Sequence, residues 1–286
     1  MAVAATGPLS LWSYSILDLE DPHFAIKAPI EPLKPQMVDQ KSKILEKRLN
    51  AWCKGLFEVN LVNPYPDIFS KKKVDFLHRT VRDFLRLKDI QNLLLARLET
   101  PFDENLTLCK ALLIQAKGVP KFDASVLEGI LDDFSYYAYQ AEKLNHQPPT
   151  LLLDEFARLM CPQEKSRYAP LHPLIIQKGL VLFVRQKLQD NPELLSTSMT
   201  YGPSLLDVAL RPSLAKSRYI GYIDPQLVRL LLDHGANPNE DSGNFLGTTT
   251  WTSFLAHITS SDVSWKSRVL DVQLYRLEYR RCRAQP

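Results

Sequence analysis

The residues that could support acid–base or nucleophilic chemistry are scattered through this sequence. His78 stands beside Arg79 and close to Asp83, where a histidine could act as a catalytic group or a charge switch near neutral pH. The simpler interpretation is a structural histidine whose ring bonds a backbone carbonyl or Asp83. The sequence has no GxSxG nucleophile turn and no HExxH zinc helix. We therefore expect no enzymatic activity and no catalytic residue.

Carboxylates and thiols give no stronger signal for chemistry. Adjacent acids occur at Asp132-Asp133 and Asp154-Glu155, but neighbours on a helix point in different directions, so neither pair is expected to share a proton. The four cysteines, which form no CxxC pair, are Cys53, Cys109, Cys161 and Cys282. This pattern indicates neither a zinc site nor a redox motif, and so few cysteines favour a reduced, cytoplasmic protein. We expect no metal and no cofactor.

Aromatic residues in one predicted helix could line a ligand site. They are Phe134, Tyr136, Tyr137 and Tyr139. Because neighbouring positions on a helix diverge, only some of them can share a face. Helical periodicity favours packing in a core over ligand binding.

The overall charge gives no indication that the protein binds nucleic acid. The chain has 35 basic and 32 acidic residues, a net charge of +3, which is too small to argue for nucleic-acid binding. The run Lys71–Lys73 is most simply a solvated turn. The basic C-terminal stretch around Arg280 is interpreted as a polar cap, although it could touch an acidic partner or RNA. No run of about 18 apolar residues occurs, so no membrane span is expected.

Helical spacing and turn signals divide the first half of the chain. Pro29, Pro32 and Pro35 indicate an extended N-terminal segment, the end of a larger element or a strap across a domain. A helix is predicted at Val38–Lys54, followed by a hairpin of Leu56–Val59 with Lys73–His78 and a helix that Thr80 caps. Four further helices are predicted at about Ile90–Leu98, Glu104–Lys117, Ala124–Leu144 and Pro149–Met160.

The stretch Asp224–Asn239, DPQLVRLLLDHGANPN, predicts a short helix that begins with an Asp cap and ends at a left-handed Gly235. It closely resembles the second helix and exit loop of an ankyrin repeat. First-helix starts that resemble the Thr-Pro-Leu-His motif occur at Ala169, Ser204 and, more loosely, Thr250. His172 and His234 are interpreted as structural. The resemblance implies about three irregular repeats.

The predicted fold class is mainly α: a small winged-helix-like unit with one β-hairpin, a helical bundle, then a short irregular ankyrin-repeat solenoid. The expected domains are an extended Pro-rich segment, the winged-helix-like unit, the helical bundle or linker, and the repeats with a C-terminal capping helix, at residues 1–38, 39–87, 88–165 and 166–286.

Phe76–Leu85, FLHRTVRDFL, resembles the signature that follows the NACHT ATPase module in fungal NOD-like (STAND) receptors. The segment Arg48–Val59 and the residues from Asp21 to Ala28 also resemble that family. The resemblance implies the C-terminal part of such a receptor. No GxxxxGK[ST] phosphate loop occurs, so ATP binding is not carried over.

We therefore expect a non-enzymatic interaction protein whose repeat surface binds an unknown protein partner. The expected contact residues are Asn237, Asn239, Glu240 and Asp241. The alternative is a truncated fragment of an ATP-dependent NACHT signalling receptor whose nucleotide-binding module lies upstream. In a longer protein, this region could contact that module within the same chain.

Overall fold

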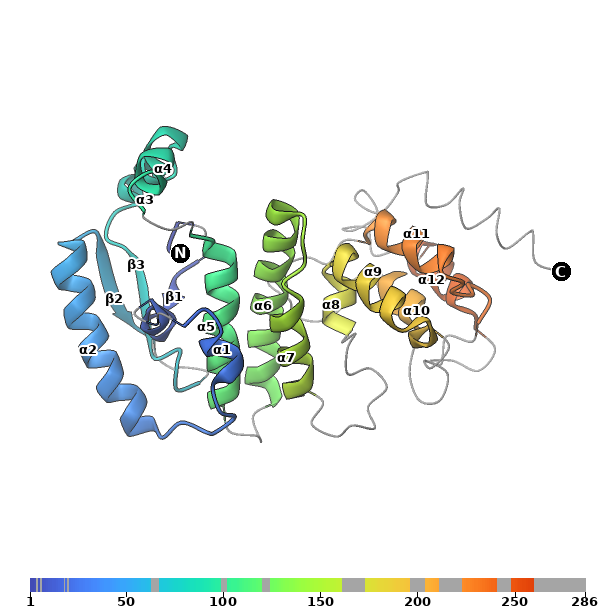
Figure 1. The fold of residues 1–286 in the computed structure, drawn as a ribbon, viewed down its shortest axis with the longest axis horizontal. Coiled ribbons are helices and arrows are strands. Elements are labelled where there is room, and N and C mark those ends of the chain that lie inside the picture. The colour runs from blue at the N-terminus through green and yellow to red at the C-terminus, as the bar shows by residue number, and fades with distance from the viewer. Residues whose placement is uncertain are drawn as a thin grey trace. The chain divides into compact units, whose positions relative to one another are not determined.

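The computed structural model describes residues 1–3, 5, 7–17, 19, 21–62, 67–98, 102–119, 124–160, 173–195, 204–210, 223–240 and 248–259. This part of the chain is mainly α with one small antiparallel sheet, as predicted (Figure 1). The chain divides into two compact units, Met1–Ala141 and Glu142–Pro286. The domain boundaries expected at residues 38, 87 and 165 stay predictions.

The first unit combines the sheet with helices before and after it. Its elements are β1 (Leu9–Ser10), the 3-10 helix η1 (Leu11–Ile16), α1 (Phe24–Lys27), α2 (Pro35–Cys53), β2 (Phe57–Leu61), β3 (Lys72–Phe76), α3 (Arg79–Leu85), α4 (Lys88–Leu95), α5 (Glu104–Gly118) and most of α6 (Ala124–Asn145).

The sheet has the order β1-β3-β2 and is antiparallel throughout. The predicted hairpin is confirmed, because β2 pairs with β3 from Phe57 opposite Phe76 to Leu61 opposite Lys72. The third strand, β1, was not part of the predicted hairpin. In β1, Leu9 lies opposite Val74. A two-residue strand is too short for the alternation that identifies strands in a sequence.

Part of the N-terminal segment is folded into the first unit, whereas residues 28–34 form no helix or strand. The 3-10 helix η1 packs against α2, α5 and β3. Its Leu11 is fully buried and joins Leu45, Leu49 and Val74 in one apolar cluster. Trp12 also lies in this core, with its ring 5.4 Å from that of Phe69. The N-terminal segment therefore contributes to the core of the first unit through η1.

Helix α2 begins three residues before the predicted start because Pro35 occupies its first turn, where a proline costs no hydrogen bond. Lys54, with φ of 43°, and Gly55, with φ of 83°, end it in left-handed conformations. The buried face includes Val38, Ser42, Leu45 and Leu49. Ile44 and Trp52, two other large apolar residues of this helix, are exposed.

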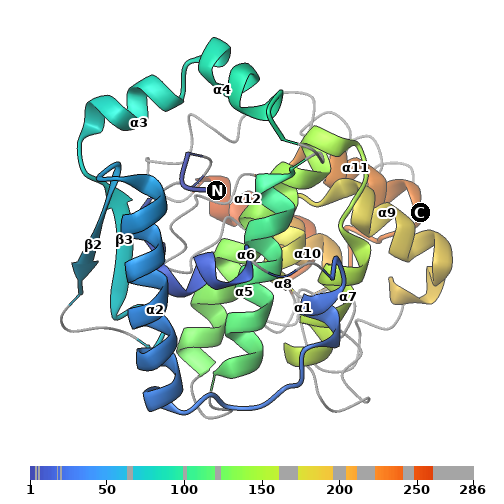
Figure 2. The ribbon, with the colours of Figure 1, turned by 60° about the vertical axis from the view of Figure 1, so that its left-hand side comes forward.

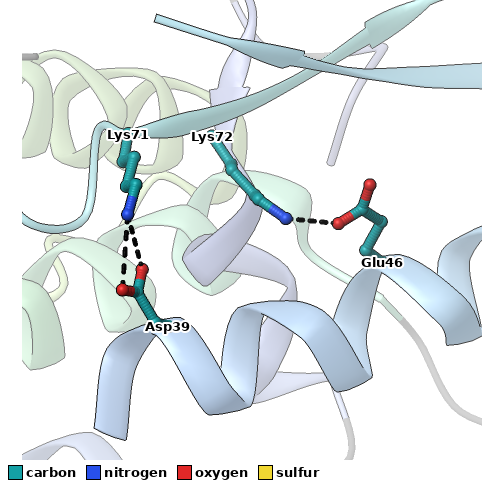
Figure 3. Close-up of polar contacts among 4 residues, drawn as sticks. All are labelled: Asp39, Glu46, Lys71 and Lys72. Atoms are coloured by element: carbon teal, nitrogen blue, oxygen red, sulfur yellow. Dashed lines mark hydrogen bonds and ion pairs between the residues drawn. The ribbon is translucent and has the colours of Figure 1, made fainter. Parts of the chain in front are cut away.

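The lysine run is not a solvated turn, which corrects that interpretation. Lys72 begins β3, and both Lys71 and Lys72 reach α2 (Figure 3). The Nζ of Lys71 lies 3.1 Å from Asp39 Oδ1, and Lys72 is paired with Glu46. These pairs join the helix to the strand. Because they are partly exposed, each contributes about 0–1 kcal/mol.

The C-terminal end of α5 holds the N-terminal segment by three neighbouring positions. Gln115 donates from Nε2 to Ser13 Oγ at 2.9 Å. The buried Lys117 donates from Nζ to the carbonyls of Ile26 and Ala28, both at 2.8 Å. The carbonyl of Gly118 accepts from the N–H of Leu33 at 3.0 Å.

The elements that the structure describes in the second unit are helices. Its elements are the end of α6, α7 (Thr150–Met160), α8 (Pro173–Gln177), α9 (Val181–Asp190), η2 (Pro192–Leu194), α10 (Leu205–Leu210), α11 (Pro225–Asp233) and α12 (Thr250–Thr259). Helix α10 packs against α8, α11 and α12, and α9 packs against α11. The helix predicted within Asp224–Asn239 is present as α11, whereas the expected C-terminal capping helix lies outside the described residues.

Candidate functional site

The predicted contact residues follow α11, whose ends match their sequence signals. Asp224 Oδ1 accepts from the N–H of Gln226 at 2.8 Å and caps the helix. At the other end, Gly235 has φ of +99°. The N–H groups of Gly235 and Ala236 donate to the carbonyls of Leu232 and Leu231, both at 3.0 Å. This pair of bonds is a Schellman motif, and it sets the direction in which the chain leaves the helix.

The turn at 236–240 places three of the four predicted contact residues together. Asn237 and Asn239 are exposed, and Glu240 is half-buried. Asp241 lies outside the described residues. Burial raises the pKa of the Glu240 carboxyl. The turn therefore offers two exposed amide side chains, which can both donate and accept hydrogen bonds.

This turn is held by a hydrogen bond within it and by two hydrogen bonds to the start of α12. Asn237 Oδ1 accepts from the N–H of Asn239 at 2.9 Å, so part of the Asn237 side chain is used by the turn itself. The carbonyls of Pro238 and Glu240 accept from the N–H groups of Trp251 and Thr250, both at 2.9 Å. A turn held in this way can present side chains with little loss of conformational entropy on binding.

A polar contact beneath the surface links α10 to α12. Ser204 Oγ accepts from the N–H of Asp207 at 3.1 Å, and it lies 3.4 Å from Thr250 Oγ1. Both hydroxyls are buried. These two residues are the starts of the second and third predicted repeat units. The structure thus brings together two positions that the sequence matched only by pattern.

Another buried polar contact has no counterpart in the sequence interpretation. The carboxylate of Glu142 accepts from the N–H of Leu182 at 2.9 Å and from that of Phe183 at 3.1 Å. It thereby serves as an N-terminal cap for α9, 40 residues away. Burial raises the pKa of Glu142, and the two hydrogen bonds act in the opposite direction. No local signal could reveal this contact, because cap motifs are sought beside the helix they cap.

The remaining chemical candidates do not assemble into a site. His78 is exposed at the start of α3, and Asp83 is paired with Arg79 at 3.4 Å. Asp154 and Glu155 diverge, as expected, since Asp154 pairs with Lys187 and Glu155 with Arg158. Phe134 and Tyr137 are buried, which supports core packing for that aromatic group.

The two thiols within the described residues show no activation. Burial raises the pKa of both Cys53 and Cys109, which disfavours the reactive thiolate. Cys161, Cys282, His172 and the basic stretch around Arg280 lie outside the described residues. Within the described ranges, no three metal-binding side chains lie together, and no helix is both long and apolar enough to cross a membrane.

Comparison with known proteins identifies one domain. Residues 1–125 match a domain of unknown function, DUF7791, which is found in fungal NACHT-associated proteins in general. The match lies within the first unit and includes β1 to α5. It covers the FLHRTVRDFL stretch, but the comparisons give no sign of ankyrin repeats or of a NACHT module. Neither the search of curated proteins nor that of solved structures found a match.

Proposed function

We propose that the chain is a non-enzymatic protein-interaction module, the ankyrin-type sensor or scaffold region of a NOD-like receptor-type protein that acts in the cytoplasm. The packing of α8 to α12 carries this proposal. Helices α8, α10 and α12 pack in succession, while α9 packs against α11. Alternate helices in contact are what stacked helix pairs require, since each short pair must bury its apolar face on the next.

The proposed partner is a protein that contacts the turn at 236–240. Its exposed amides at Asn237 and Asn239 suit recognition of polar groups on a folded surface. Repeat proteins use such successive tips as extended binding faces. Nucleic acid is not part of the proposal.

The test compares capture of partners by the full chain and by turn variants. Asn239→Ala removes an exposed amide, whereas Asn237→Asp keeps the acceptor that closes the turn but changes the surface group. Both are expected to reduce capture of one defined partner without changing thermal unfolding. Leu231→Ala is the folding control, because this leucine is fully buried and its loss should cost about 2–5 kcal/mol. Undiminished capture by both turn variants contradicts the assigned surface.

The second candidate function is that of a fragment of an ATP-dependent NACHT receptor whose nucleotide module lies upstream. The DUF7791 match supports it, because that domain is found in fungal NACHT-associated proteins. Its test is an immunoblot of the source cells with an antibody against residues 225–239. A band several times the 32.7 kDa of this sequence supports the fragment. A band at that mass supports an independent module.

A further inference from the structure

A second interaction surface lies in the first unit, on α3 and α4. Neither helix contains a buried residue. In Figures 1 and 2, the two helices lie beyond the ends of α2 and α5. Helices of seven and eight residues are not stable alone, so they normally depend on packing of an apolar face. Here, packing within the described structure leaves those faces uncovered.

The exposed residues are large and apolar. Between 47% and 55% of each residue is exposed in the group Phe84, Leu87, Leu93, Leu94, Leu95 and Leu98. We call this group, together with the five basic residues at positions 79–98, the α3–α4 surface. Several large apolar residues exposed on two helices in contact with each other indicate an interaction site.

The arrangement of the leucines favours a protein over a membrane as the occupant. Leu93, Leu94 and Leu95 are consecutive, so their side chains leave α4 about 100° apart. A membrane surface buries one face of a helix that lies on it. It would therefore leave part of this group in water, whereas the side chains of a partner helix can interdigitate with neighbouring leucines that diverge.

The charge of the surface indicates the chemistry of that protein. Residues 79–98 contain five basic and two acidic side chains, a net charge of +3. One of the two acids, Asp83, is already paired with Arg79. Two copies of the chain would therefore bring like charges together, which opposes self-association through this surface. A partner with acidic residues around an apolar stripe is complementary to it.

We propose that the α3–α4 surface is a docking site for an acidic amphipathic helix of another protein. The partner's apolar stripe packs on Leu94 and Leu95, and its carboxylates pair with basic groups such as Arg86 and Lys88. This interaction is separate from the one proposed for the turn at 236–240.

The test measures binding of designed helical peptides to the full chain by fluorescence anisotropy. The probe is a peptide of about three heptads with leucine on one face and glutamate on the other. One control peptide replaces glutamate by lysine, and another replaces leucine by serine. The acidic amphipathic peptide is expected to bind at least about tenfold more tightly than either control, and more weakly as salt rises from about 50 to about 500 mM.

Two variants locate the binding. Leu94→Gln with Leu95→Gln keeps good helix propensity and should weaken binding at least about tenfold. The matched control is Ile44→Gln, at a 56% exposed position of α2, which should leave binding unchanged. Lys88→Glu should weaken binding of the acidic peptide and favour the lysine peptide. Circular dichroism and thermal unfolding check that each variant is folded.

Several outcomes overturn the proposal. They are absence of binding to the acidic peptide, binding that survives the Leu94/Leu95 change, and equal binding of the lysine peptide. A further test uses phosphatidylcholine–phosphatidylserine vesicles. If the chain binds them, and the same double variant abolishes that binding, the occupant is a membrane. If sedimentation shows a dimer that the double variant dissociates, the occupant is a second copy.

Discussion

Ser204 Oγ and Thr250 Oγ1 lie 3.4 Å apart in the interior of the second unit. Ser204 stands immediately before α10, and Thr250 is the first residue of α12. Equivalent hydroxyls at the starts of two helices therefore meet, although 46 residues separate them in sequence. This contact joins the units that the proposed repeat array requires to be neighbours.

The two hydroxyls should contribute unequally to stability. Ser204→Ala removes the group that accepts from the N–H of Asp207, and loss of such a cap costs about 0.5–2 kcal/mol. Thr250→Val keeps the shape of the side chain and should cost less. Because 3.4 Å is long for a hydroxyl hydrogen bond, a double-mutant cycle in urea should give a coupling energy below about 1 kcal/mol. A larger coupling energy means that the contact is stronger than its geometry indicates.

Lys117→Met should destabilise the first unit. Its ammonium is buried and donates to the carbonyls of Ile26 and Ala28, which the variant leaves without this donor. We expect a loss of about 2–4 kcal/mol and faster proteolysis within residues 21–34. Lys110→Met is the control, since that ammonium lies 5.9 Å from the ring centroid of Phe24. Its loss should cost below about 1 kcal/mol. Equal effects of the two variants contradict the role of Lys117.

Two glycines give opposite predictions for the same substitution. A Cβ on Gly118 would come 2.9 Å from the ring of Phe69 and 3.0 Å from Leu33 Cδ1, so Gly118→Ala should destabilise by about 1–3 kcal/mol. A Cβ on Gly129, in α6, meets nothing within 4 Å. Gly129→Ala should therefore stabilise by about 0.5–1 kcal/mol through helix propensity. Thermal unfolding of both variants checks the sign of each effect.

Glu142 should give the second unit a pH dependence of known sign. Burial raises its pKa above the ordinary 4.5, so the folded state binds the proton more tightly than the unfolded state. Its contribution is fully present below pH 4.5 and is lost as pH rises through the folded pKa. Asp224 adds to the rise in pKa, whereas Arg185 opposes it. As pH rises from 4.5 towards 7, the free energy of unfolding of the wild type should therefore fall relative to that of Glu142→Gln.

The measurement for Glu142 is the difference between the two proteins in urea unfolding at several pH values, which cancels the other titrating groups. Asp224→Asn is a second comparison, and it should lower the pKa of Glu142. A pH slope that is the same in wild type and Glu142→Gln would falsify the assignment. At neutral pH, Glu142→Ala should cost about 1–3 kcal/mol, because the N–H groups of Leu182 and Phe183 lose their acceptor.

The sequence predicted what local chemistry determines. Asp224, Pro225 and Gly235 are cap residues, so both ends of α11 were predicted correctly. Helix α5 was predicted to end within one residue of its observed end at Gly118. For the candidate site, the turn at 236–240 followed from the same signals, because a glycine that ends a helix fixes where the exit begins.

What the sequence did not reveal depends on contacts between distant residues. The pairing of Lys71 with Asp39 is decided by how α2 lies against β3, not by either segment alone. Periodicity on α2 could not separate the buried Leu45 from the exposed Ile44, since adjacent apolar positions border the same stripe. The α3–α4 surface was missed for a related reason: the exposure of Phe84 is a tertiary property, which helical spacing alone does not determine.

The central place of η1 has a consequence for how the first unit acquires its structure. Ser13 meets Gln115 across 102 residues of sequence, and Leu11 packs with residues of α2 and β3 that are synthesised later. Such non-local contacts slow folding, because a long loop must close before the contacts form. During synthesis, the emerging N-terminal segment therefore keeps Leu11 and Trp12 exposed until α5 has left the ribosome. Chaperone demand and aggregation of the nascent chain should be greatest in that interval.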